Sequence, residues 1–524
     1  MLFKRILILL FVFTSFSFYG TKSSSLYAQY ERKLTRVERS ADRNFVQLRF
    51  EKAMNRYERA SGKENDVENQ AALQLKMARL YFMIREYEKA ISHYSATLKL
   101  NPDLPYTDDL CDYIDALRFI GKNKEAEAIC LDYAFKDKYT NNQRYKNILD
   151  ALSLRFSIHD NPAYSIMRMK LNTSDSEYWI GNYGGELFYA LSYGKFNDPR
   201  KVFFHQTKYY KLDHEADFDG QKAPRYYNYF KGIPVDMQNG PLSFSPDLSM
   251  MVSTVIEYNK AKKTVEMVER ETRPFRSKLY YSVLSDKQKK FKKYLPIFPQ
   301  EAAYSYAHPF LFNDGKSLMF SSDMPGGYGG FDLYVTHWSD ADGKWGMPVN
   351  LGAMVNTEGD EVYPIISDGT MIYSSNGLPG FGGYDLFSVQ LDSKSVVPGS
   401  LYHYPSPINS VFNDYYMYPV SSSKSYLISD RGRETLDDIY FVEVSNHVDL
   451  KLTSPYYGME ESKALKGGEL LLNEKTDSSQ SSVVSLKPLA PEGLLITLYF
   501  DFDSYRLTDE STKRLEKFIH EMSE

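Results

Sequence analysis

Between Phe310 and Tyr440 one pattern recurs three times along the chain. In each copy an apolar strand ends in small polar residues, a loop follows, and an aspartate opens a second apolar strand. These aspartates, Asp332, Asp385 and Asp438, stand 53 residues apart. A fixed period near 50 residues with two or more strands per unit is typical of a β-propeller, in which each unit is one blade.

Looser copies of the pattern precede the three clear ones. Residues 185–192 and residues 243–255 each carry a similar apolar strand that is followed by a second one. Five copies are therefore visible, and the length of the segment leaves room for another. We expect a propeller of six blades over residues 163–449, with a helical domain before it and a short α/β piece after it.

Short turn motifs follow the first strand of several copies. Asp247 lies in the motif Ser-Pro-Asp, while Asp314 and Asp368 are each followed by glycine. Aspartate can accept backbone N–H bonds and glycine can adopt positive φ, so each motif predicts a tight hairpin turn. The motifs resemble the Pro-Asp-type repeats in the propellers of TolB-like periplasmic proteins.

Glycine-rich loops precede the first two aspartates of the long repeat. We expect Asp332, Asp385 and Asp438 to cap these loops by accepting hydrogen bonds from the loop backbone. A ring of calcium ligands is the alternative, although each aspartate has few acidic neighbours in the sequence.

One connecting run stands out between two of the repeats. It reads W-x-x-P-x-N-L-G and then N-T-x-x-x-E, and it is typical of propellers in a group of Bacteroidota envelope proteins. We expect Trp345 to pack on the neighbouring blade, and Asn356 with Glu361 to order the connecting turn. A ligand site at these polar residues is the alternative.

Residues 29–162 are predicted to be helical. Small, aromatic and helix-stopping positions follow a fixed spacing at Ala78, Tyr81, Ala90, Tyr94 and Pro102. This spacing resembles the tetratricopeptide family, which implies stacked helical pairs with a concave groove for a peptide or protein segment. A rigid spacer that packs on the propeller is the alternative.

The two ends of the chain carry different signals. Lys4 and Arg5 precede an apolar run and small polar residues, which predicts a secretory signal peptide over residues 1–28. Residues 450–493 are polar and predict a linker. Residues 494–524 contain the run YFDFDS and a helix, and they resemble the opening of the OmpA-like peptidoglycan-binding domain. The Asp and Arg that hold peptidoglycan in that family come later, so this incomplete piece is not expected to bind it.

The sequence offers little for catalysis. It contains no G-x-S-x-G elbow, Walker loop, H-E-x-x-H or paired C-x-x-C motif, so we expect no enzyme activity, cofactor or metal. The formal net charge of −5 gives no reason to expect nucleic acid as a partner. Cys111 and Cys130 are expected to be buried thiols, with a disulfide between them as the alternative.

Four aromatic residues of the glycine-rich loops form the candidate interaction surface. They are Tyr328, Phe331, Phe381 and Tyr384. The order of segments resembles the PorE-like, OmpA-family periplasmic proteins of Bacteroidota. That resemblance implies a periplasmic scaffold at the outer membrane that binds envelope proteins, among them components of type IX secretion. A glycan- or ligand-binding propeller, with these aromatics on one face, is the alternative.

Overall fold

The computed structural model describes most of the chain up to residue 445. The described residues are 35–46, 49–102, 107–133, 142–154, 160–193, 206–212, 226–227, 238–258, 275–285, 290–291, 294–298, 304–392, 396–397, 399–432 and 437–445. The chain divides into two units, residues 1–473 and 474–524, and all described residues lie in the first. The predicted signal peptide (1–28), linker (450–493) and OmpA-like piece (494–524) lie outside the described residues.

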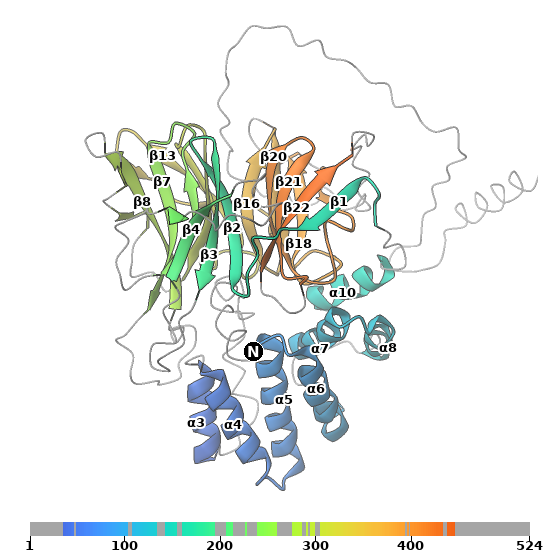
Figure 1. Cartoon of the computed structure of the whole chain (residues 1–524). Coiled ribbons are helices and arrows are strands. Elements are labelled where there is room, and N and C mark those ends of the chain that lie inside the picture. The colour runs from blue at the N-terminus through green and yellow to red at the C-terminus, as the bar shows by residue number, and fades with distance from the viewer. Residues whose placement is uncertain are drawn as a thin grey trace, which may run out of the picture. The chain divides into compact units, whose positions relative to one another are not determined.

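The described residues before position 160 form a run of helices in which neighbours along the chain pack together (Figure 1). These helices are α3 (Arg36–Val46), α4 (Phe50–Ser61), α5 (Val67–Met83), α6 (Tyr87–Leu100), α7 (Thr107–Phe119), α8 (Asn123–Tyr133) and α10 (Gln143–Leu154). Ala78 of α5 and Ala90 of α6 are fully buried, which lets the two helices approach closely. Cys111 and Cys130 are buried and free, so the disulfide alternative is wrong. Among the described residues no helix is long and apolar enough to cross a membrane.

Ion pairs connect α5 with α3 and α7, and α7 with α10. They join Lys76 to Glu38 and Asp42, Arg79 to Asp109, and Arg144 to Asp112 and Asp115. The carboxylates of Glu38, Asp42 and Asp109 are at most 4% exposed, so these pairs are shielded from solvent. These pairs therefore neutralise buried carboxylates where the helices pack together.

The described strands form five separate antiparallel sheets, so the propeller has five blades (Figure 1). Blade 1 contains β2 (Ser176–Tyr183), β3 (Glu186–Tyr193), β4 (Gln206–Lys211) and β5 (Tyr226–Tyr227). Blade 2 contains β6 (Gln238–Phe244), β7 (Met250–Tyr258), β8 (Phe275–Ser285), β9 (Lys290–Phe291) and β10 (Leu295–Pro296). Blade 3 contains β11 (Tyr306–Phe312), β12 (Ser317–Ser322), β13 (Asp332–Ser339), β14 (Lys344–Trp345) and β15 (Val349–Asn350). Blade 4 contains β16 (Glu361–Ser367), β17 (Thr370–Ser375), β18 (Asp385–Gln390) and β19 (Tyr402–His403). Blade 5 contains β20 (Asp414–Ser421), β21 (Lys424–Ser429), β22 (Asp438–Val444) and β1 (Tyr164–Arg168).

The prediction of six blades is wrong, and strand β1 gives one reason. It follows the helices directly and pairs with β22, from Tyr164 opposite Val444 to Arg168 opposite Tyr440. The first strand after the helices thus completes the last blade instead of starting a new one. The other residues that made a sixth blade seem possible lie in long segments that connect the strands of blades 1 and 2. One such segment joins β7, which ends at Tyr258, to β8, which begins at Phe275.

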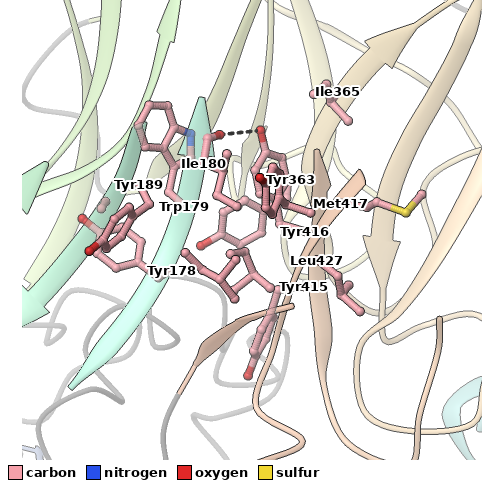
Figure 2. Packing of buried hydrophobic residues seen from close by; sticks show 14 of the residues in the cluster. Tyr178, Trp179, Ile180, Tyr189, Tyr363, Ile365, Tyr415, Tyr416, Met417 and Leu427 are labelled. Carbon is pink, nitrogen blue, oxygen red and sulfur yellow. Dashed lines mark hydrogen bonds between the residues drawn. The ribbon is translucent and has the colours of Figure 1, made fainter. Parts of the chain in front are cut away.

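The first strands of the blades meet around a central axis. Strands β2, β6, β11, β16 and β20 contact one another in a closed ring. Strand β12 is buried along its whole length, because neighbouring blades cover both of its faces. Figure 2 shows part of the central core, where Tyr363 and Tyr416 lie close to Trp179 and Ile180 of blade 1.

Candidate functional site

A pocket of about 90 Å³ lies on the propeller axis, between the inner strands of all five blades. Every blade contributes at least one aromatic side chain to it. These are Trp179, Phe244, Phe310, Tyr363, Tyr416 and Tyr418. Two lining residues, Asn182 and Phe244, lie at the ends of β2 and β6, next to the turns that follow these strands. The mouth of the pocket therefore faces the end of the propeller that carries these turns. None of the described residues in the lining is Asp, Glu, Lys or Arg.

A β-bulge interrupts each inner strand at the depth of the pocket. In three strands the bulge contains a proline, in the pairs Gly240-Pro241, His308-Pro309 and Tyr363-Pro364. Proline cannot donate to a strand ladder, so a bulge is where an inner strand tolerates it. His308 and Tyr363 adopt φ values of 52° and 53°, a strained conformation that costs a residue other than glycine about 1–3 kcal/mol. The bulges therefore fix the direction of these side chains at the axis.

The polar groups of the wall are held in place by hydrogen bonds to other residues of the propeller. The ring of His308 lies 4.0 Å from that of Tyr363, and its Nδ1 is 2.6 Å from Ser321 Oγ. Burial lowers the pKa of His308 to about 3, so it is neutral at pH 7. The hydroxyl of Tyr416 donates to the carbonyl of Ile180 at 3.0 Å (Figure 2). The site is thus uncharged and largely aromatic.

The four aromatic residues predicted to form an interaction surface do not form one. Phe331 and Tyr384 are each 1% exposed and belong to the central core. Both are fastened to Asp360, which accepts the backbone N–H of Phe331 at 2.7 Å and the hydroxyl of Tyr384 at 2.8 Å. Phe381 is half-buried against the ring of His403. The two glycine-rich loops lie against the connections to the next blades, which cover most of their aromatic side chains. Of the four residues only Tyr328 is exposed.

Asp332 and Asp385 cap their loops, as predicted. Asp332 accepts the backbone N–H groups of Tyr328 at 2.6 Å and Gly329 at 3.1 Å. Asp385 accepts those of Phe381 and Gly382, and it also contacts Nε2 of His403 at 2.7 Å. Part of the loop before Asp438 lies outside the described residues, and Asp438 forms a bidentate ion pair with Arg168 of β1. This aspartate therefore helps to fasten the strand that closes the ring. Among the described residues no group of three or more His, Cys, Asp or Glu could hold a metal.

The hairpin aspartates stabilise turns, and Trp345 packs in the core between two blades. Asp247 accepts a hydrogen bond from the backbone N–H of Ser249 at 3.0 Å, and hydrogen bonds from the Ser245 hydroxyl, Ser249 N–H and Ser249 hydroxyl lower its pKa. Asp314 and Asp368 themselves adopt positive φ, with the following glycines, in tight turns. Trp345 packs edge-to-face on Trp338 and belongs to a cluster that spans blades 2 and 3.

An asparagine side chain takes the place of a strand partner in three blades. The sequence suggested this kind of role only for Asn356. Asn356 accepts the N–H of Leu333 at 2.7 Å and donates to its carbonyl at 3.0 Å. Asn409 does the same with Leu386, and Asn172 with Ile439. The neighbouring Glu361 accepts hydrogen bonds from the N–H and hydroxyl of Thr357. The N-T-x-x-x-E run thus orders the connection between blades 3 and 4.

The helices contact the propeller at blades 4 and 5. Arg85, in the turn between α5 and α6, is 2.7 Å from Asp430, 3.8 Å from Asp437 and donates to the hydroxyl of Tyr415 at 2.8 Å. Burial lowers the pKa of Arg85, but Tyr415 and the two carboxylates outweigh that effect and raise it. Arg85 is therefore charged, and it pairs with carboxylates that are almost inaccessible to water.

A second contact involves the glycine-rich loop of blade 4. The guanidinium of Arg118 donates to the carbonyls of Gly380 and Phe381 at 2.9 and 3.0 Å, and Asn147 donates to the carbonyl of Gly377. This loop joins the second and third strands of its blade, so it lies at the opposite end from the pocket mouth. A loop that the sequence suggested as a ligand surface is thus a contact surface for the helices.

Sequence reasoning missed both Arg85 and the pocket. Nothing in the helical spacing marks Arg85, because its partners lie more than 300 residues away. The pocket had one usable signal, a proline that recurs within an apolar strand at Pro241, Pro309 and Pro364. Proline inside a strand indicates a bulge, and bulges often adjoin functional sites.

Comparisons with known proteins add only limited information. No protein-family model and no curated protein matches the chain. An alpha-L-arabinofuranosidase from Lactobacillus brevis is similar at 10% identity, over 53% of this chain and 93% of that one, with a TM-score of 0.35. RS223-Beta-xylosidase matches at 7% identity, over 54% and 95%, with a TM-score of 0.33. Hydrazine synthase of Kuenenia stuttgartiensis matches at 15% identity, over 51% and 36%, with a TM-score of 0.29. Similarities this low carry no argument about what the chain does.

Proposed function

We propose that this chain is a non-enzymatic scaffold of the bacterial cell envelope that binds other envelope proteins. On this proposal residues 1–28 direct export, and the protein acts in the periplasm near the outer membrane. The resemblance to tetratricopeptide repeats, a Pro-Asp-type propeller and the opening of an OmpA-like domain supports this assignment. The same order of segments connects it with type IX secretion. Neither peptidoglycan nor nucleic acid is among its proposed partners.

The composition of the axial pocket is the observation that carries the proposal. Glycoside hydrolysis, for example, uses a pair of carboxyl groups that flank the bond to be cleaved. The described lining of this pocket contains none, and its one histidine is held neutral and stacked on Tyr363. An axis filled with aromatic rings suits contact with a partner better than proton transfer.

The contacts between helices and propeller also support a scaffold. Arg85 and Arg118 bridge the two domains through buried polar contacts, so a partner bound to one domain would be held at a fixed position relative to the other. The ion pairs between the helices stiffen the helical domain in the same way. Two binding architectures that are joined by buried contacts can hold two partners near each other.

Site-specific photo-crosslinking in cells of the native organism tests the proposal. A photoreactive amino acid would replace Tyr328, which is 39% exposed on blade 3, or Leu131, which is 52% exposed on α8. The matched control position is Val67, which is 56% exposed at the start of α5. We expect discrete adducts with envelope proteins at one or both test positions and not at Val67. Adducts at none of these positions, or hydrolysis of glycosides by the purified chain, would contradict the proposal.

A further inference from the structure

The pocket on the propeller axis has the properties of a binding site for one small, uncharged group. Its volume of about 90 Å³ is well below the roughly 300–1,000 Å³ of sites for drug-sized ligands. It is also below the roughly 150 Å³ of an engineered cavity that takes up benzene. A cofactor or a disaccharide is therefore too large, whereas a single amino-acid side chain is of suitable size.

Charge and hydrogen bonding narrow the choice further. No charged side chain lines the described wall, so an ionised group would lose its hydration without gaining a counter-ion. Several polar groups of the wall already bond within the propeller. Asn182 accepts the N–H of Gly185, Ser243 accepts the N–H of Leu311, and the hydroxyl of Tyr416 donates to Ile180. A sugar ring, which needs partners for several hydroxyls, is poorly served by such a wall, while an apolar group loses nothing.

The wall is also rigid before anything binds. The strained backbone at His308 and Tyr363 persists because the surrounding sheets hold it, and such strain clusters at binding sites. The indole of Trp179 packs directly against Gly181. A Cβ at Gly181 would come within 2.2 Å of the indole, so the absence of a side chain there makes room for the ring. A preformed pocket spares the ligand the entropic cost of ordering its site.

We propose that the axial pocket receives one uncharged apolar side chain from a protruding loop of a partner protein. The rest of that loop would lie on the end of the propeller where the β2 and β6 turns surround the mouth, away from the end that the helices contact. An anchor residue in a well-packed aromatic pocket is a common centre of a protein interface. This inference rests on the proposed scaffold function and specifies where one partner binds.

Fluorine NMR of the exported chain tests the inference, because the protein has three tryptophans. Trp179 lines the pocket, whereas Trp338 and Trp345 pack on each other in blade 3 and serve as internal controls. The chain would be labelled with 5-fluorotryptophan and each signal assigned by a Trp→Phe variant. The probes are N-acetyl-leucinamide and N-acetyl-prolinamide, with N-acetyl-glycinamide, methyl β-glucopyranoside and tetramethylammonium for comparison.

We expect a saturable shift of the Trp179 signal alone, in the millimolar range that suits so small a ligand, with leucinamide or prolinamide and not with glycinamide. Tyr418→Ala, at the pocket wall, should weaken this binding at least about fivefold. Tyr281→Ala, an equally half-buried tyrosine outside the pocket, should leave it unchanged.

Three results would overturn the inference: no shift of Trp179, equal shifts of all three tryptophans, or a selective shift with only the glucoside or the ammonium ion. If cellular crosslinks form while the probes fail, the scaffold function stands and only this binding site is wrong. If the probes bind and no crosslink forms at any of the tested positions, the pocket still binds a small apolar group, but the scaffold function is wrong and the partner loop with it.

Discussion

Replacing Arg85 by glycine should loosen the helices from the propeller. Arg85 adopts a φ of 58°, which glycine accepts without strain, so the change removes the guanidinium and leaves the turn intact. Asp430 and Asp437 are 4% and 2% exposed, and both would lose their counter-ion in a site that water barely reaches.

The size of the effect follows from that burial. Removing one partner of a buried ion pair costs about 3–5 kcal/mol. Relief of the left-handed conformation returns about 1 kcal/mol. The helical domain should therefore lose about 2–4 kcal/mol of stability. With a urea dependence of about 2 kcal/mol per molar, its unfolding midpoint should fall by about 1–2 M.

Two spectroscopic signals separate the domains in a urea titration. The three tryptophans belong to β2, β13 and β14, so their fluorescence reports the propeller. Far-ultraviolet circular dichroism reports mainly the helices. We expect the two curves to coincide for the native sequence, and the dichroism curve to move to lower urea for Arg85→Gly.

A control and a rescue sharpen this test. Lys316→Ala breaks an exposed ion pair with Asp340 and should leave both curves in place. Adding Asp430→Asn and Asp437→Asn to Arg85→Gly removes the unpaired charges and should restore part of the lost stability. Curves for Arg85→Gly that still coincide at the native midpoint would refute the argument that this cluster couples the domains.

Three further changes test other parts of the fold. Gly181→Ala places a Cβ 2.2 Å from the Trp179 indole and should cost about 1–3 kcal/mol through overpacking, seen as a lower melting temperature, whereas an unchanged melting curve would show that the indole can move aside. Asn356→Ala leaves the buried N–H and carbonyl of Leu333 without this partner and should cost about 2–4 kcal/mol in urea unfolding, and a loss below about 1 kcal/mol would count against the strand-partner role. Burial raises the pKa of Glu361 to about 8, so the folded chain holds a proton that the unfolded chain releases near pH 4.5, and stability should fall as pH rises through that window. Melting curves at three pH values should show this slope, and Glu361→Gln should flatten it.

The sequence repeat was sufficient to predict a propeller because each blade is built mainly from local contacts. Asp332 and Asp385 accept N–H groups only three or four residues away, and the turns at Asp314 and Asp368 depend on neighbouring residues. Spacing and residue type therefore carry that part of the structure.

The blade number and the exposure of the loop aromatics depend on contacts between distant residues. The number of blades was set by the pairing of β1 with β22, about 270 residues apart. In the sequence Phe331 and Tyr384 look like surface residues of glycine-rich loops, but in the structure both contact Asp360, in the connection between blades 3 and 4. Neither contact has a local signature.

The sequence by itself determined the repeated antiparallel unit, its turns and the helical character of residues before the propeller, because short-range hydrogen bonds and apolar periodicity set these features. The tertiary structure alone decided that five units close the ring, that Arg85 joins helices to blades, and that aromatic side chains from every blade converge on one axis. Ring closure brings together residues that are distant in sequence, and the packing at that axis is a property of the closed ring and of no single blade.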